Sequence, residues 1–455
     1  MQTCYFYRAF TPSLQQMNFW KSFFGDTSAP KSAPNIPFGR YTDANKSPVQ
    51  LAAWDEAVDL FEKGQAMKAY REFLRYLRDD TLDNVRWTES SGRIDFELSQ
   101  GSRLISGSAT PELVQVSSKL AQAADLNVGF LRRLMEHNYV LKFSRYALSA
   151  DNELCILFDS STTDGSPLKL LHALRELSIH ADKQDDLLFE EFRTLKPADV
   201  PSATDIPEAE KDVKYRYLVR AFEKTLELLH TGKPAPTQYP GGYAFHMLGT
   251  AYRIDYLVKP EGYVMYLLEH MHTIYFTKGE RNTHQKVEQL RREIRKILER
   301  PREQVMRELY RTTSTFGVNP PVNHERIANL IEVELPNMDW HLQQGNEALS
   351  LGVPLYIAGY AFFHFSPPPP DRQFLHLIFR VTEPDFFQEL GFSDAFTDAS
   401  GRPLKQAVLQ AIHNIAAEHQ AQYPKLKPNI KHLDFSSTAL WAKSYLEMIR
   451  GLQLS

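Results

Sequence analysis

The chain has 455 residues, of which 43% are hydrophobic, 24% are charged and 12% are aromatic. This length exceeds what one hydrophobic core usually serves, so we expect two to three domains of roughly 150 residues each. The composition is that of a folded globular protein and excludes a wholly disordered chain. A formal net charge of -4 disfavours nucleic acid as a partner, because nucleic-acid-binding proteins usually carry a basic face or an overall positive charge.

The cysteines and the apolar runs of the sequence indicate where in the cell the protein is expected. The two cysteines, Cys4 and Cys155, lie far apart, whereas a secreted protein of this size more often carries paired cysteines. The N-terminus lacks the pattern of a signal peptide. The best candidate for a membrane span, residues 353–365, is shorter than the roughly 20 residues that cross a bilayer. The sequence therefore predicts a cytoplasmic protein that is not an integral membrane protein.

Residues 1–50 are predicted to form an N-terminal extension and linker. The stretch 26–50 is rich in Ser, Pro, Ala, Asn and Lys, and it cannot bury enough apolar surface to offset the entropy of the chain. Upstream of it, four aromatic residues occur at helical spacing, namely Phe19, Trp20, Phe23 and Phe24. We expect a terminal helix that docks on its own protein, and contact with a membrane surface or a partner is the alternative.

Residues 51–193 are predicted to form an α+β domain. Two short helices come first, at 51–61 and 67–77, and the string 57–70 resembles one tetratricopeptide unit. Short segments with near-alternating apolar residues predict a three-stranded meander at 85–88, 92–98 and 102–106. The remaining predicted elements are a helix over 110–124, a helix that starts at Asn127, strands at 139–149 and 153–159, and a long helix over 167–192.

This order of elements resembles the YbjN-like group of bacterial proteins, which look like relatives of type III secretion chaperones of the CesT kind. The local phrases that carry the resemblance are Ile105-Ser106-Gly107, Leu126 through Asn138, Phe143, Asp151 through Ile156, and Leu168 through Asp186. The resemblance spans about residues 50–193, under a third of the chain. It implies a compact α-β-β-β-α-β-β-α unit that often pairs through its sheet or a helix and that binds polypeptide. We therefore expect a polypeptide partner and a homodimer through this first domain.

Residues 194–212 contain three prolines and no apolar periodicity, and they are predicted to be a linker. Residues 213–352 are predicted to be a mainly helical domain. Its apolar faces lie at 218–229, 243–258, 263–276, 284–311 and 324–351. Within 284–311, Pro301 either kinks one helix or starts a second. This stretch is basic, which is compatible with RNA, anionic lipid or the acidic first domain as a partner, but a solvated face is favoured.

Residues 353–455 are predicted to form a C-terminal α+β part packed on the helical domain. Apolar runs at 353–365 and 373–381, separated by Pro367 to Pro370, predict an aromatic β-hairpin with a stiff tip. Helices at 403–420 and 437–450 follow. The hairpin aromatics are favoured as core residues. The alternative is an exposed binding surface, for which the candidate residues are Tyr356, Tyr360, Phe363, His364, Asp371 and His376.

No sequence motif indicates catalysis, a cofactor or a metal. His270 and His272 lack the spacing of the zinc-protease motif. On facing strands, His364 and His376 would be neighbours, and a hydrogen-bonded buried pair is favoured over a metal site. A Gly-rich phosphate loop, a Gly-x-Ser-x-Gly elbow and a Cys-x-x-Cys pair do not occur in the sequence.

Two functional hypotheses follow from the sequence. The first is a non-catalytic, polypeptide-binding or chaperone-like protein that uses the first domain. The second is an enzyme or small-ligand binder with a pocket between the helical region and the aromatic hairpin, using His364, His376 or Asp371. The second hypothesis predicts a convergent cluster of polar groups inside an apolar cavity.

Overall fold

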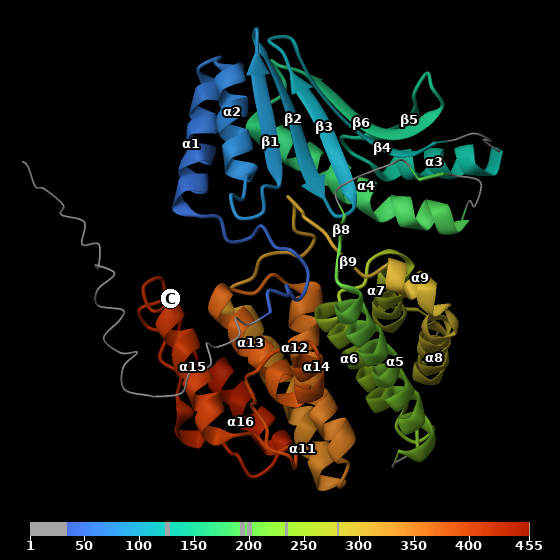
Figure 1. Ribbon diagram of the computed structural model, residues 1–455, viewed down its shortest axis with the longest axis vertical. Coiled ribbons are helices and arrows are strands. Elements are labelled where there is room, and N and C mark those ends of the chain that lie inside the picture. The colour runs from blue at the N-terminus through green and yellow to red at the C-terminus, as the bar shows by residue number, and fades with distance from the viewer. Residues whose placement is uncertain are drawn as a thin grey trace, which may run out of the picture.

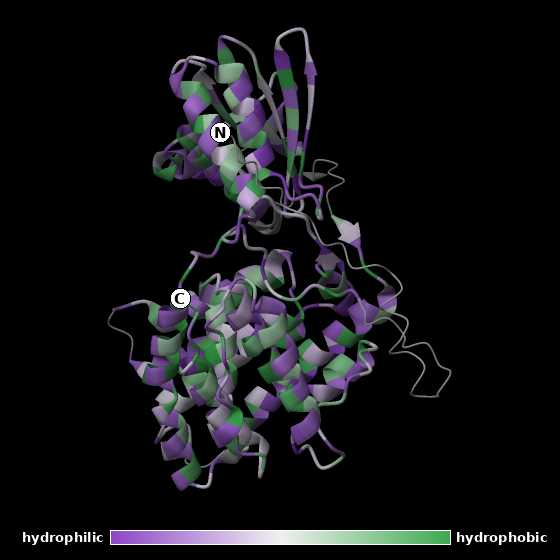
Figure 2. Cartoon of the chain, turned by 90° about the vertical axis from the view of Figure 1, so that its left-hand side faces the viewer, coloured by the Kyte–Doolittle hydropathy of each residue, from purple (hydrophilic) through white to green (hydrophobic). Residues whose placement is uncertain are grey.

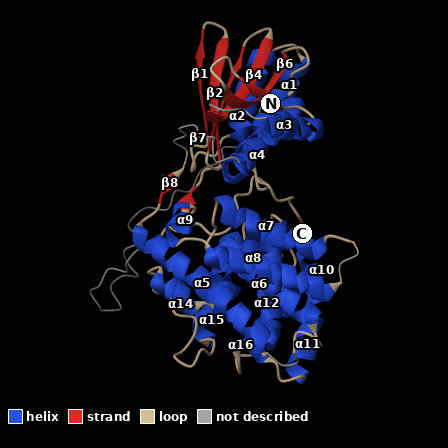
Figure 3. Cartoon of the chain, turned by 90° about the vertical axis from the view of Figure 1, so that its right-hand side faces the viewer, coloured by secondary structure: helices blue, strands red, loops and turns tan. Residues whose placement is uncertain are grey.

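The computed structural model describes residues 34–122, 128–191, 196–197, 203–232, 235–279 and 282–454. The chain has a mixed α+β fold, in which a domain built on an antiparallel sheet stands on a larger, mainly helical domain (Figures 1 and 3). Each domain has its own buried apolar cluster. The predicted N-terminal helix around Phe19 and the predicted helix start at Asn127 lie outside the described residues.

The sheet domain begins with two helices, α1 (Pro48–Glu62) and α2 (Ala66–Leu77), which pack against each other. Ser47 and Gln50 form a capping box at the start of α1, and Pro48 occupies its first turn. The other elements are β1 (Val85–Ser90), β2 (Arg93–Gln100), β3 (Arg103–Ala109), β4 (Leu113–Gln122), α3 (Val128–Val140), β5 (Arg145–Leu148), β6 (Glu153–Ser161) and α4 (Pro167–Glu191). The strand order is β1-β2-β3-β4-β6-β5, and the short β7 (Lys196–Pro197) pairs with β4.

One face of the sheet is covered and the other is open. Helices α2 and α4 contact the strands from one side, while α1 packs on α2 (Figure 1). Along β4, Val114, Val116 and Leu120 are buried, whereas Gln115 and Ser117 are exposed. This alternation is what a sheet with one packed face and one solvated face requires.

The strand β4 corrects the predicted helix over 110–124. The helical prediction rested on apolar residues spaced by three or four, such as Val116 and Leu120. Residues four apart share a face in a strand as well as in a helix, so this pair does not discriminate between the two. The predicted strand at 139–149 is also shorter than expected, because α3 extends to Val140 and β5 begins at Arg145.

The helical domain contains α5 to α16. The bounds are α5 (Glu208–Thr231), α6 (Pro240–Leu257), α7 (Gly262–Phe276), α8 (Thr283–Glu299), α9 (Arg302–Arg307), α10 (His324–Glu334), α11 (Pro336–Gln343), α12 (Glu347–His364), α13 (Pro369–Thr382), α14 (Pro384–Glu389), α15 (Lys405–His419) and α16 (Thr438–Arg450). A two-stranded ladder pairs β8 (Thr204–Asp205) with β9 (Tyr310–Arg311). Pro301 does not kink one long helix over 284–311. It is the N-cap of a second helix, α9.

The predicted aromatic β-hairpin is wrong. Its two runs are the helices α12 and α13, so the C-terminal region is not an α+β part, and the predicted domain limit at 352/353 falls inside α12. The run of 13 residues at 353–365 is apolar on all sides, because α12 lies in the centre of the domain beside α6, and such a run has no helical periodicity to detect. The prolines that suggested a hairpin tip instead begin α13, where a missing backbone N–H costs nothing.

No helix in the described part of the chain is both long enough and apolar enough to cross a membrane. Figure 2 agrees, since hydrophilic and hydrophobic residues are interspersed along the helices of both domains.

The two domains exchange short segments. The arm, residues 34–43, precedes the sheet domain in sequence but lies on the helical domain, where Phe38 contacts the rings of Tyr256 and His376. The strap, residues 312–317, belongs to the helical half of the sequence but enters the sheet domain. Phe316 is 1% exposed and is a member of the apolar cluster of the sheet domain. Gln100 at the end of β2 accepts hydrogen bonds from the backbone N–H groups of Thr315 and Phe316.

Candidate functional site

Four of the six candidate residues lie along α12 in an aromatic cluster. Tyr356, Tyr360, Phe363 and His364 contact one another or the rings of Tyr252 on α6 and His272 on α7. Tyr356 and Phe363 are buried. The Oη atom of Tyr252 lies 2.6 Å from Nδ1 of His272. Burial, followed by the nearby positive charges of His364 and Arg40, lowers the pKa of His272 to about 4.

Asp371 is not part of this cluster. It is 0% exposed and lies in the first turn of α13, where its two carboxylate oxygens are 2.9 and 3.1 Å from Nδ1 of His324 on α10. Burial raises the pKa of Asp371. Burial alone would lower the pKa of His324, but the hydrogen bond and the charge of Asp371, together with backbone hydrogen bonds to Arg450 and Leu452, raise it. The pair ties α13 to α10 inside the core.

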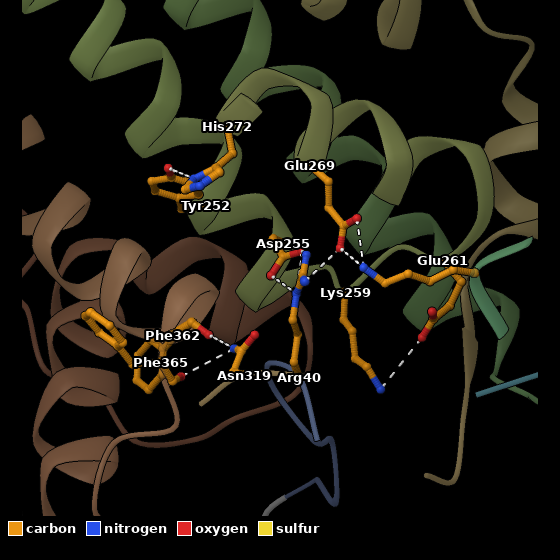
Figure 4. A network of polar contacts seen from close by, with 11 residues as sticks. Arg40, Tyr252, Asp255, Lys259, Glu261, Glu269, His272, Asn319, Phe362 and Phe365 are labelled. Atoms are coloured by element: carbon orange, nitrogen blue, oxygen red, sulfur yellow. Dashed lines mark hydrogen bonds and ion pairs between the residues drawn. The ribbon is translucent and has the colours of Figure 1, made fainter. Parts of the chain in front are cut away.

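The arm inserts a guanidinium between two helices of the helical domain. In Figure 4 the side chain of Arg40 points between Asp255 on α6 and Glu269 on α7. Nη2 of Arg40 lies 2.7 Å from Oδ1 of Asp255, and Nη1 lies 2.9 Å from Oε1 of Glu269. The Arg40 side chain is 12% exposed and Asp255 is 5% exposed. Glu269 is also bound by Lys183 of α4 at 3.3 Å, so the network joins the arm, the helical domain and the sheet domain.

Gly39 permits this approach. Its N–H donates to the carbonyl of Tyr256 at 2.9 Å, its φ is +73°, and a Cβ there would lie 2.6 Å from the ring of Tyr256. Both the positive φ and the absence of space favour glycine. Farther along the arm, Asp43 accepts hydrogen bonds from Arg175 of α4 and from the backbone N–H of Gly317, the last residue of the strap.

Beside the arm lies a cavity of about 350 Å³, which we call the α13 pocket. It is lined by Phe38 of the arm, Tyr256 of α6, Arg372, Gln373, His376, Leu377 and Arg380 of α13, Phe396, and Ala411 and Ile415 of α15. One of the six candidate residues, His376, is therefore in a cavity. The structure does not bring the six together on one surface, and His364 and His376 are on different helices rather than facing strands.

The polar groups of the α13 pocket come mainly from one face of α13. Arg372, His376 and Arg380 are four residues apart, and this spacing stacks side chains on one side of a helix. Oη of Tyr256 lies 3.0 Å from Nδ1 of His376. A tyrosine hydroxyl that donates to Nδ1 leaves the ring hydrogen of a neutral histidine on Nε2, so the ring keeps a donor.

His376 is uncharged at neutral pH. Burial, with the positive charges of Arg380 and Arg372 in addition, lowers the pKa of His376 to about 3. In the unfolded chain the pKa returns to roughly 6.5. As the pH falls from 6.5 toward 3, His376 therefore becomes protonated in the unfolded state but stays neutral in the folded state. This difference in proton uptake lowers the free energy of unfolding on acidification.

A pH series should detect this histidine. Between pH 6.5 and 4.5 the wild type is expected to lose about 2 kcal/mol more unfolding free energy than a His376→Gln variant, which keeps a hydrogen-bond acceptor for Tyr256 but cannot titrate. Urea unfolding at three pH values in this interval measures the difference. Equal losses of unfolding free energy in the two proteins would show that His376 becomes protonated in the folded state over this pH range.

Sequence reasoning missed the two arginines of the pocket. The spacing of Arg372, His376 and Arg380 was a usable signal, but it is informative only in a helix, and the segment was expected to be a strand. Phe38 was missed because residues 34–43 read as a linker. No local pattern reveals that a linker residue forms the wall of a cavity in another domain.

Within the described residues, no group of three or more His, Cys, Asp or Glu side chains is arranged to hold a metal ion. No family model matches the chain, and no curated protein matches it.

Proposed function

We propose that the chain is a small-molecule-binding protein whose ligand occupies the α13 pocket. The observation that carries the proposal is an open pocket of about 350 Å³ in which aromatic and aliphatic side chains lie beside a few polar groups. Ligand pockets in proteins typically have volumes of about 300–1,000 Å³ and this kind of lining. Binding is favoured over catalysis because the lining residues offer no carboxylate, thiol or amine, and His376 is too weak a base at neutral pH.

A blocking substitution tests this proposal. Ala411 is a small residue in the wall that α15 provides, so an Ala411→Trp variant should fill the pocket. Calorimetric titration with hexanoate, 1-hexanol and hexylamine should show saturable binding of at least one probe to the wild type and its loss in the variant. Ile415→Trp is a second blocking variant, and circular dichroism checks that each variant is folded. Failure of all three probes to distinguish the wild type from folded blocked variants would contradict the proposal.

A second candidate function, polypeptide binding by the sheet domain, is favoured by the surface of α3. Val128, Met135 and Tyr139 are 82%, 72% and 91% exposed, and they lie at helical spacing on one side of α3. Leu148 on the neighbouring edge strand β5 is also exposed. Exposed apolar patches commonly mark protein interaction sites. This candidate agrees with the resemblance to the YbjN-like and CesT-type proteins, which likewise remains a proposal.

Replacing Met135 and Tyr139 by lysine tests the second candidate. The tagged wild type should retain a polypeptide from its own host at a stoichiometric amount, and the double variant should not. Leu168→Lys changes another exposed residue of the same domain and serves as the control. Pairing with a second copy would instead appear as a dimer in sedimentation that the double variant abolishes. A wild type that is monomeric and retains no polypeptide would rule out this role for α3.

A further inference from the structure

Resting on the proposed function, we infer that the ligand of the α13 pocket is an organic anion: an apolar body that carries a carboxylate or phosphate group, which Arg372, His376 and Arg380 bind.

The first support is the donor excess of the pocket. None of the ten lining residues is acidic, while two of them carry guanidinium groups. The Nε and Nη2 atoms of Arg380 are buried and have no hydrogen-bond partner. Its nearest carboxylate, that of Asp394, is 3.7 Å from Nη2 and belongs to a side chain that is 67% exposed. Leaving buried donors of a charged group without partners costs free energy, so the positive charge of Arg380 is incompletely compensated within the protein.

The position of Arg380 is fixed by aromatic rings rather than by acids. Its guanidinium lies 4.7 to 5.2 Å from the centroids of Phe387, Phe392 and Phe396. These contacts stabilise a cation through the faces of the rings, but they offer no acceptor to its N–H groups. The guanidinium is therefore held beside the pocket mainly by ring contacts, and a planar guanidinium is the group that best matches a carboxylate or phosphate.

Arg372 adds a second positive charge. It is partly buried on the same face of α13, and it forms no ion pair among the described residues. Burial lowers the pKa of both arginines, which means that each guanidinium lacks full compensation by nearby negative charge. An anionic group placed between them would supply that compensation.

The rest of the cavity fits an apolar body. Phe38, Leu377, Phe396, Ala411 and Ile415 form the wall around the donors. A free inorganic anion would leave this wall without contact, whereas a short hydrocarbon or an aromatic ring would cover it. The charged head of the ligand would bind the arginines, and the apolar wall would limit the size of the ligand's apolar body.

Matched probes separate the head from the body. Hexyl phosphate has the same hexyl chain as 1-hexanol, hexanoate has a chain one carbon shorter, and inorganic phosphate has a head alone. In calorimetry at low ionic strength, at least one of the two organic anions should bind at least tenfold more tightly than 1-hexanol and than inorganic phosphate. The stronger of the two identifies the head as carboxylate or phosphate.

Arginine variants test the residues that recognise the head. Arg380→Met and Arg372→Met should each weaken binding of the preferred anion by about tenfold or more. Arg380→Lys should retain part of the affinity, because lysine keeps the positive charge but lacks the planar fork of the guanidinium. Binding of 1-hexanol should change little. Arg402→Met, at an exposed position outside the pocket, is the control for a lost charge.

Two outcomes would overturn the inference. The first outcome is that 1-hexanol binds as tightly as the anions and that its binding is lost in Ala411→Trp. The pocket would then still be a ligand site, but its ligand would be neutral. The second outcome is that Arg402→Met weakens anion binding as much as the pocket variants do. Binding would then reflect general attraction between charges and not recognition by the α13 pocket.

Discussion

Replacing Arg40 by Met should lower the free energy of unfolding by about 3–5 kcal/mol, because removal of one partner from a buried ion pair leaves the other charge uncompensated. Asp255 is 5% exposed and would lose its guanidinium, and Glu269 would keep only Lys183 among the partners that the structure shows. Methionine keeps the apolar stem of arginine as far as the position of Nε, so the loss reports mainly on the missing guanidinium. Urea unfolding followed by far-ultraviolet circular dichroism measures the change.

An exposed pair provides the matched control. Arg71 binds Glu89 with two hydrogen bonds, but the side chains are 44% and 36% exposed. Arg71→Met should therefore cost no more than about 1 kcal/mol. Similar losses at Arg40 and Arg71 would show that the Arg40 network is not a buried one. An Asp255→Asn change added to Arg40→Met should recover part of the loss, since it removes the orphaned charge.

The Arg40 variant also bears on the α13 pocket. Arg40 is two residues from Phe38, which forms one wall of the pocket. If the arm leaves the helical domain, the pocket loses this wall, and binding of the preferred anion should weaken together with stability. Arg71→Met should leave binding unchanged. Tight binding by a folded Arg40→Met protein would show that the arm stays in place without its ion pairs.

Replacing Phe316 by Ala should destabilise the sheet domain by about 3–5 kcal/mol, the usual cost of removing a fully buried phenyl ring. Phe316 is 1% exposed and packs in the apolar cluster of the sheet domain, although it follows β9 in the helical half of the sequence. The expected effect is local. Backbone amides of β2 and β3 should exchange hydrogen faster in the variant, as hydrogen-exchange mass spectrometry can show, while amides at the centre of α6 and α12 should not.

Phe276→Ala is the control for Phe316, because it removes the same ring from a site that is 44% exposed. It should cost much less and should not alter exchange in β2 or β3. Uniform acceleration of exchange in both domains of the Phe316 variant would contradict the separate core of the sheet domain. It would mean that the strap, the arm and the two domains unfold as one unit.

Several elements could be recognised from the sequence because local chemistry specifies them. The helices predicted at 51–61 and 67–77 are present as α1 and α2, and β1, β2 and β3 lie where alternating residues and turn residues predicted three strands. The capping box of Ser47 and Gln50, which starts α1 at Pro48, lies in the stretch that was predicted to be a linker. The mixed α+β class follows from such signals. Each depends on residues that are neighbours in the sequence, and the same contacts are present in the folded protein.

The tertiary structure decided the elements whose local pattern is ambiguous. Val116 and Leu120 have the same spacing in a strand and in a helix, and pairing with β3 and β6 makes β4 a strand. The apolar run of α12 is buried on all sides beside α6, so no polar face is left to reveal its period. In both cases the neighbour that selects the conformation is distant in the sequence.

The candidate site depends on the same long-range contacts. The sequence supplied His376 and the apolar residues of α13, but it did not place Phe38 against them. Phe38 reaches the pocket because the arm crosses to the helical domain, where Arg40 binds Asp255, a residue 215 positions farther along the chain. Local periodicity fixes which face of an element is buried, whereas the partner on that face is set by packing of the whole chain.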